Sequence, residues 1–418
     1  MTGATTTPGG GRVAAHAAIT FAGLMSANVL GYVFYALLSR ALGVEAYGTL
    51  SSLLAVVLIV SAPALIAQMV SAKLASDFAS DPARLAGLVR AIDAVALRVS
   101  LGVAAVLALL AVPLAGFLHV SDPVLVLLAA LSLCGAIVLP FLRGVLQGTS
   151  SFRAFALSNV AENFGKALFA PALATVAGLR GAMAGLALGY AAAAAYTFVA
   201  ARPHGRGTAA TFSLRAVAKT SAAVALSVFC VNLLLFYDVI LAKRYLDAHT
   251  AGLYGAAALC GRALYAVIVF VPTVLLPQTA SRAALGQRTR WLFAQALATV
   301  AVLCLAACAL YALAPGFVIT TIAGRAFAAG APFVLPYVVA IAALATANMV
   351  ATYNVARNRL RFVVPLLCVA AGEVIAVVVR HRSAADLLQT IAAGHALALL
   401  ACMSSLGSAR AEPRRTGG

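Results

Sequence analysis

The sequence has few charged residues and very few acids. Of its 418 residues, 10% are charged and only 11 are Asp or Glu, whereas 64% are hydrophobic. The mean hydropathy is +1.03. Soluble domains carry about 25% charged residues. The deficit excludes a soluble globular protein, and apolar runs that recur from residue 14 to residue 407 predict an integral membrane protein.

Sequence patterns of catalysis and metal binding are missing as well. Gly165-Lys166 is the only Gly-Lys pair, and it lacks the upstream glycine and the following Ser or Thr of a phosphate-binding loop. There is no GxSxG motif, and the six histidines show no metal-ligand spacing. The seven cysteines lie in apolar runs without a CxxC pair, which predicts helix packing rather than disulfides. We therefore predict no enzyme activity, no cofactor and no metal.

The formal net charge of +18 does not indicate a nucleic-acid partner. No basic stripe or aromatic platform accompanies the charge. Lys and Arg in membrane proteins gather mainly in cytoplasmic loops. We therefore expect no nucleic acid among the partners.

The apolar runs predict about twelve transmembrane helices, each about 20 residues long, which is the length that crosses a hydrocarbon core of about 30 Å. The expected spans are 14–38, 49–70, 94–117, 124–142, 156–178, 181–201, 216–237, 252–276, 291–313, 329–351, 362–380 and 384–407. On one side, the loops and termini contain 19 Lys and Arg residues, against 7 on the other. This asymmetry predicts that both termini are cytoplasmic.

An internal repeat relates the two halves of the chain. Displaced by 204 residues, LLSRALGVEAYGTL at 37–50 aligns with LAKRYLDAHTAGLY at 241–254, so that Arg40 meets Arg244 and Gly48 meets Gly252. In the same register, Asn28 meets Asn232. Six helices separate the copies, and an even number keeps the same membrane orientation. The repeat therefore predicts two parallel six-helix lobes around a central cavity, as in transporters that rock between two faces.

The predicted organisation follows from the spans and the repeat. It consists of a cytoplasmic N-terminal tail at 1–13, an N-terminal lobe at 14–201, a cytoplasmic linker at 202–215, a C-terminal lobe at 216–407 and a cytoplasmic tail at 408–418.

Three stretches resemble the polysaccharide (O-antigen) flippases of the multidrug/oligosaccharidyl-lipid/polysaccharide exporter superfamily. They read LLSRALGVEAYGTLSSLLAVVL at 37–58, LRGVLQGTSSFRAFALSNV at 142–160 and YDVILAKRYLDAHTAGLYGAAALCGRAL at 237–264. The resemblance implies export of an oligosaccharide on polyprenyl pyrophosphate, for lipopolysaccharide or another surface polysaccharide, across the bacterial inner membrane. The partners that it implies are this lipid-linked oligosaccharide, membrane lipids, and polysaccharide polymerase and chain-length proteins. Val44 departs from the proline that is common in the family.

Charged residues deep in the membrane are candidates for function because their burial there is unfavourable. The predicted substrate-binding residues are Arg262 and Lys166 near the midplane, Arg98 closer to a helix end, and the repeated amides Asn28 and Asn232. The predicted ion-coupling residues are Glu373, Asp238 and Glu162. For the first two cations a structural role is the alternative, since Glu162 stands four residues before Lys166, the favourable order for a helical ion pair. Glu373 has no partner near it in sequence, and Arg262 is one candidate.

Two other functions remain open at this point. An ion-coupled exporter of drugs or small solutes would share the fold, although the first helix lacks an acidic residue. A membrane-embedded glycosyltransferase or polymerase would need acids or histidines on a long outer loop, and every predicted outer loop is short.

Overall fold

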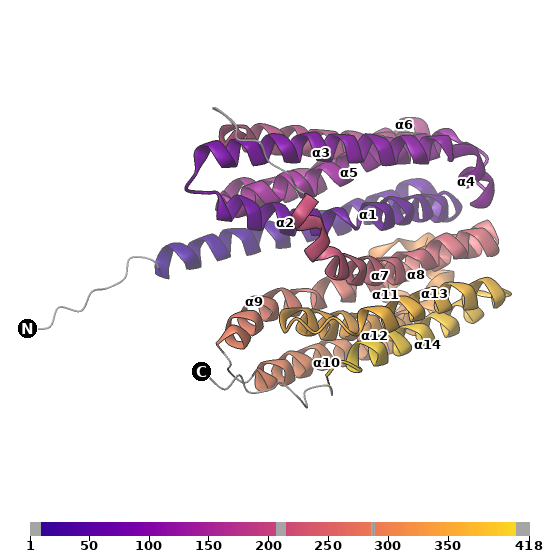
Figure 1. Cartoon of the computed structure of the whole chain (residues 1–418). Coiled ribbons are helices and arrows are strands. Elements are labelled where there is room, and N and C mark those ends of the chain that lie inside the picture. Colours follow the sequence, from indigo (N-terminus) through magenta and orange to yellow (C-terminus); the bar gives the residue numbers. More distant parts are fainter. Residues whose placement is uncertain (1–9, 206–214, 286, 288, 407–418) are drawn as a thin grey trace, which may run out of the picture. The chain divides into compact units, whose positions relative to one another are not determined.

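The structure is a computed structural model that describes residues 10–205, 215–285, 287 and 289–406 (Figure 1). The predicted tail at 408–418 lies outside the described residues, as do most of the predicted tail at 1–13 and of the predicted linker at 202–215. The secondary structure of the described residues is helical, which confirms the predicted all-α class.

The α-helices and the 3₁₀ helices η1 and η2 follow one another along the chain. Their bounds are α1 Gly10–Ser61, α2 Ala64–Asp77, α3 Pro82–Leu109, α4 Ala111–Phe117, α5 Val124–Gly148, α6 Phe152–Ala201, η1 Arg202–Gly205, α7 Arg215–Tyr245, α8 Ala248–Ile268, α9 Phe270–Ala284, α10 Arg290–Leu313, α11 Pro315–Ile322, η2 Arg325–Gly330, α12 Ala331–Ala356, α13 Val363–Val379 and α14 Ala384–Met403.

Within the described part of the chain, nine helical segments are long and apolar enough to cross a membrane. One of 54 residues contains two of the predicted spans, and one of 59 residues contains one predicted span and most of another. The shorter apolar helix α13 coincides with the predicted span 362–380. Every predicted span therefore overlaps helical structure among the described residues, and the chain is a multi-pass membrane protein.

The longest helices turn at glycines. α1 has a non-helical residue at Gly43, with a φ of 74° and a ψ of 179°, inside the predicted break between its two spans. α6 has two, Ala177 and Gly178, and Gly178, with a φ of 54° and a ψ of −133°, directly precedes the predicted break. Backbone of this kind strongly favours glycine, because a Cβ would be strained there.

The two segments of α6 pack against each other as an antiparallel hairpin. A Cβ built on Gly181 would overlap the backbone of Leu173, and one built on Gly185 would overlap that of Ala170. Gly189 approaches Lys166 in the same way. Close approach through small residues is the common mode of helix packing in membranes, where water cannot drive association.

Helix α3 begins at Pro82, earlier than the predicted span, which begins at residue 94. The Asp81 side chain accepts from the Arg84 backbone N–H at 3.0 Å, and Pro82 follows it, so the helix begins there rather than at residue 94. Charged residues in the first turns of α3 lower the local hydropathy. A span predicted from the length of the apolar run therefore begins later than the helix does.

The described chain forms two compact units. Unit 1 comprises the residues up to Leu42, Ala64–Gly116 and Ser121–Lys219. Unit 2 comprises Gly43–Pro63, Phe117–Val120 and the residues from Thr220 onward. The second half of α1 thus belongs to unit 2, although the chain on both sides of it belongs to unit 1.

Two glycines that the repeat aligns lie against each other inside unit 2. A Cβ built on Gly48 would stand 2.9 Å from the Gly252 nitrogen, and one built on Gly252 would overlap the Val44 carbonyl. Residue 255 of α8 is also glycine and faces Ser51. The second half of α1 and α8 therefore meet backbone to backbone.

Candidate functional site

A buried charged cluster in unit 1 joins α5 to α6. Lys166 Nζ donates to Glu162 Oε1 at 2.7 Å, one helical turn away on α6. Arg143 reaches the same carboxylate from α5, with 2.8 Å between its Nη1 and Glu162 Oε2. Arg143 also donates to the hydroxyl and the carbonyl of Ser158, at 2.9 and 2.8 Å. We call Arg143, Glu162 and Lys166 the unit 1 cluster.

The unit 1 cluster contains two cations and one carboxylate. The exposed fractions of the side chains are 8% for Arg143 and 13% for both Glu162 and Lys166, so bulk water screens them little. The Lys166 ammonium also lies 5.0 Å from the centre of the Tyr190 ring, a further favourable contact for a cation. The cluster therefore keeps one positive charge in excess, next to a neutral aromatic ring.

Arg143 corrects the prediction from the sequence. The predicted span 124–142 places Arg143 in a cytoplasmic loop. In the structure α5 continues to Gly148, and Arg143 is buried. An arginine directly after a predicted span, with an acid within reach on the next helix, is the signal that could have found it.

A second cluster, in unit 2, surrounds Asp238 on α7. Arg262 Nη2 on α8 lies 2.8 Å from Asp238 Oδ1, and the hydroxyls of Tyr254 and Tyr337 donate to Oδ2 at 3.2 and 2.7 Å. Arg262 Nε donates to the Leu235 carbonyl at 3.0 Å. Asp238 is 1% exposed. Two predicted residues with different expected roles thus form one buried ion pair, stabilised by two tyrosines.

Glu373 on α13 belongs to the same network through the neighbouring residue of α7. The Tyr237 hydroxyl donates to Glu373 Oε1 at 2.7 Å, and His395 Nε2 on α14 lies 3.5 Å from the same oxygen. Within the described residues, Glu373 Oε2 is buried without a hydrogen-bond partner. Arg262, the candidate partner in the sequence, pairs with Asp238 instead.

His395 is surrounded by acceptors. Its Nδ1 lies 3.0 Å from the Ala340 carbonyl, and its Nε2 lies 3.2 Å from the Leu234 carbonyl. A carbonyl oxygen only accepts, so a neutral imidazole satisfies one of the two and a doubly protonated ring satisfies both. The ring is 1% exposed and lies beside the carboxylate of Glu373.

We call Asp238, Arg262, Tyr237, Glu373 and His395, together with Tyr254 and Tyr337, the unit 2 cluster. His395 was missed in the sequence, although it stands well inside the predicted span 384–407 and the argument that selected Glu373 applies to it equally. The three tyrosines gave no signal, because an isolated tyrosine in an apolar run is common.

The remaining predicted residues stand apart from both clusters. Arg98 is exposed on α3, and Asn28 is half-buried on α1. Asn232 on α7 donates from its side chain to the Val228 carbonyl of the same helix at 2.9 Å. Substrate binding by these three residues stays a prediction.

Metal binding has no support among the described residues, where no group of three or more His, Cys, Asp or Glu is arranged to hold an ion. All seven cysteines are free.

The family of the chain is established by residues 13–281, which match the model of the polysaccharide biosynthesis protein family. The chain belongs to this family. Both clusters include residues of the matched region, and the predicted resemblance to the multidrug/oligosaccharidyl-lipid/polysaccharide exporter superfamily is confirmed. No curated protein matches the sequence.

Solved structures share the fold of this polysaccharide biosynthesis family member at low identity. An inward-facing multidrug resistance MATE family transporter of the MOP superfamily is 14% identical, with a TM-score of 0.72 over 90% of this chain and 92% of that one. The lipid II flippase MurJ in its inward closed conformation is 13% identical, with a TM-score of 0.70 over 94% and 87%. The eukaryotic MATE transporter AtDTX14 is 12% identical, with a TM-score of 0.66 over 93% of each chain. These similarities establish the predicted two-lobed helical fold.

Proposed function

We propose that this protein is a flippase that moves a polyprenyl-pyrophosphate-linked oligosaccharide from the cytoplasmic to the outer leaflet of the bacterial inner membrane, for surface polysaccharide synthesis. Membership of a polysaccharide biosynthesis family supports the substrate class. A fold shared with transporters and with a lipid II flippase supports movement across the membrane rather than a chemical reaction. Polysaccharide polymerase and chain-length proteins are the proposed partners.

The observation that carries this proposal is the excess positive charge of the unit 1 cluster. Glu162 balances only one of its two cations. An unbalanced charge among membrane helices is costly and is kept where a ligand uses it. Pyrophosphate oxygens are strong acceptors for Lys and Arg, so an anionic head group supplies the missing negative charge. For Glu162 we propose this balancing role in place of ion coupling.

We propose that the unit 2 cluster couples transport to an energy source, because its two acids, Asp238 and Glu373, each lie beside a basic side chain. Asp238 is already paired with Arg262, whereas Glu373 and His395 present a buried carboxylate beside a ring surrounded by acceptors. A proton is the ion that suits this arrangement, because the imidazole nitrogen occupies the place next to the carboxylate where a metal cation would need oxygen ligands.

The test compares Lys166→Gln with Lys166→Arg in vesicles that contain the purified protein and a fluorescent polyprenyl-pyrophosphate oligosaccharide. Lys166→Gln removes the excess charge and leaves the pair of Arg143 and Glu162 intact. We expect the initial rate of flipping to fall at least tenfold in Lys166→Gln and to stay within about twofold in Lys166→Arg, since about 1.4 kcal/mol of lost binding is tenfold. An unchanged rate in Lys166→Gln at equal protein content would remove the cluster from the mechanism.

The same vesicles separate the other functions. Movement of a cationic drug without movement of the sugar lipid would establish a drug exporter. A change in the length of the oligosaccharide would establish an enzyme. We expect neither.

A further inference from the structure

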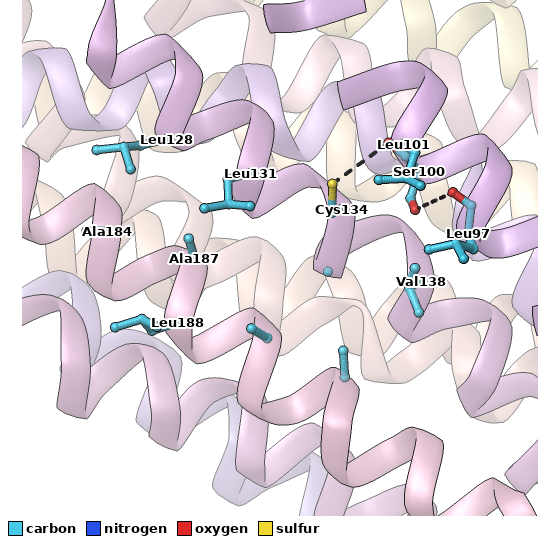
Figure 2. A pocket seen from close by; sticks show the side chains of 13 residues that line it. Leu97, Ser100, Leu101, Leu128, Leu131, Cys134, Val138, Ala184, Ala187 and Leu188 are labelled. Atoms are coloured by element: carbon cyan, nitrogen blue, oxygen red, sulfur yellow. Dashed lines mark hydrogen bonds between the residues drawn. The ribbon is translucent and has the colours of Figure 1, made fainter. Parts of the chain in front are cut away.

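A long apolar groove runs along unit 1, between α3, α5 and the second segment of α6, and Figure 2 shows the residues that line its first hollow. Two adjoining hollows form it, of about 540 and 590 Å³. Leu97, Val138 and Ala194 line both hollows, so the groove is continuous.

Small residues form the floor of the groove. Ala184, Ala187, Ala191 and Ala194 recur every three or four residues along one face of α6. Gly135 brings α5 against that helix, since a Cβ built there would stand 2.6 Å from the Tyr190 Cβ. Half-exposed leucines form the rims, among them Leu97, Leu101, Leu131 and Leu188.

The first hollow offers almost no polar group. The Ser100 hydroxyl donates to the Leu97 carbonyl of its own helix at 3.0 Å (Figure 2). The Cys134 thiol lies 3.8 Å from the Ala130 carbonyl, also on its own helix. The ligand that fits this hollow is hydrocarbon.

The second hollow ends at two charged residues, Arg90 and Asp93, one turn apart on α3. Arg90 is exposed, and Asp93 Oδ1 is buried without a hydrogen-bond partner among the described residues. A guanidinium binds phosphate oxygens, and an unpartnered carboxyl oxygen accepts from a hydroxyl. The groove therefore suits a lipid with an anionic, hydroxylated head. The charge distribution predicts that this end is cytoplasmic.

The length of the groove selects among such lipids. From Ala184 to Phe198 on α6, and from Leu128 to Leu142 on α5, fourteen residues separate the ends, or about 21 Å at 1.5 Å per residue. One leaflet provides only about 15 Å, half of a hydrocarbon core of about 30 Å. A phospholipid acyl chain stays within its leaflet, whereas a polyprenyl chain extends beyond it.

We infer that the groove binds the polyprenyl chain of the proposed substrate, with its phosphate end at Arg90. This inference rests on the proposed function. The groove is then the binding site for the hydrocarbon part of the substrate on unit 1. It is separate from the unit 1 cluster, which we assign to the pyrophosphate during transport.

The experiment uses the full-length protein in lipid nanodiscs with a polyprenyl phosphate that carries a photoreactive diazirine on its chain. Labelled peptides are mapped by mass spectrometry. We expect labels on α3, α5 and the second segment of α6, with unlabelled polyprenyl phosphate competing at least tenfold better than phosphatidylglycerol. Equal competition by phosphatidylglycerol, or labelling that nothing displaces, would overturn the inference.

Neighbouring alanines supply a matched pair of variants. Ala191 lines the groove, and Ala192 is exposed on the same helix but does not line it. We expect Ala191→Trp to reduce the displaceable labelling at least fivefold and Ala192→Trp to leave it unchanged, at equal yield and equal melting temperature. Equal labelling in the two variants would contradict binding of the polyprenyl chain in the groove.

The proposed contact of Arg90 with phosphate is tested by removing the charge of the side chain. Arg90→Gln is expected to weaken competition by polyprenyl phosphate at least threefold and to leave competition by the uncharged polyprenol unchanged. Flipping by the wild type is measured in parallel. If the wild type flips the sugar lipid while labelling fails these tests, the groove is wrong and the proposed function stands. If labelling passes and flipping is absent, the function fails and the binding site stands.

Discussion

Glu162 forms ion pairs with both Arg143 and Lys166. Replacing Glu162 therefore removes two ion pairs, whereas replacing either cation removes one. Removing one partner of a buried ion pair leaves a charge without compensation, which costs about 3–5 kcal/mol. Without Glu162, both Arg143 and Lys166 lose their counter-charge. Without Lys166, one balanced pair remains.

The first prediction follows from this asymmetry. We expect Glu162→Gln to lower the stability of the protein by about 3 kcal/mol or more, and Lys166→Gln to lower it by less than about 1 kcal/mol. Thermal unfolding of the two variants in the same detergent measures the difference. Equal melting temperatures would show that Glu162 does not stabilise both cations.

A second feature at this scale is the contact of Glu373 with Gly394. The Glu373 carboxylate occupies the space where a Cβ of residue 394 would stand. A methyl group at that position therefore has to displace the carboxylate from Tyr237 and His395. Gly372 on α13 offers a control, since nothing lies within 4 Å of the Cβ position there.

We expect Gly394→Ala to reduce flipping driven by a proton gradient at least tenfold and Gly372→Ala to leave it within about twofold, on the basis that 1.4 kcal/mol corresponds to tenfold. Initial rates in vesicles with and without an imposed pH difference provide the measurement. A variant Gly394→Ala that responds to the gradient like the wild type would exclude Glu373 from coupling.

At the scale of elements, the hairpin of α6 depends on one backbone conformation. Gly178 has a φ of 54° and a ψ of −133°, with nothing within 4 Å of its Cβ position. The conformation, not the space, therefore requires glycine. Gly102 lies inside α3 and is equally open, but its backbone is helical.

The two glycines predict opposite effects of one methyl group. Gly178→Ala should destabilise the protein by about 1–3 kcal/mol, the strain of such a conformation. Gly102→Ala should be neutral or should stabilise it by up to about 1 kcal/mol. Denaturation in detergent distinguishes them, and a stable Gly178→Ala variant would show that the hairpin tolerates another turn.

The same scale shows what a sequence can predict in a membrane protein. Apolar length located every span and both internal breaks, because crossing a bilayer is a local property of about 20 residues. It placed the end of α5 and the start of α3 wrongly, since both helices continue past their apolar part with charged residues such as Arg143 and Arg90.

Pairing of side chains was predictable only where it is local. Glu162 and Lys166 lie four residues apart, and their contact was anticipated as the alternative to substrate binding. The partners of Arg262 and Glu373 come from other helices, 24 and 136 residues distant in the chain. Those contacts depend on tertiary packing, which periodicity does not report.

At the scale of the whole molecule, the repeat found in the sequence has a counterpart in space. Gly48 and Gly252 align at a displacement of 204 residues, and in unit 2 they touch each other. The two aligned copies of the repeat therefore meet backbone to backbone at this pair of glycines.

The grouping of the helices into units does not follow the order of the chain. The segment Gly43–Pro63 is encoded in the first half of the sequence and packs with the second. A gene divided between residues 205 and 215 should accordingly yield two polypeptides that associate without a covalent link. We expect the co-expressed halves to purify together and to restore surface polysaccharide.

Gly252→Ala should weaken the association of the two halves, because its methyl group would meet the Val44 carbonyl. Gly316→Ala, with open space around its Cβ position, should leave the association intact. Halves that never purify together would show that the continuous chain, and not the glycine contact, keeps this segment in place.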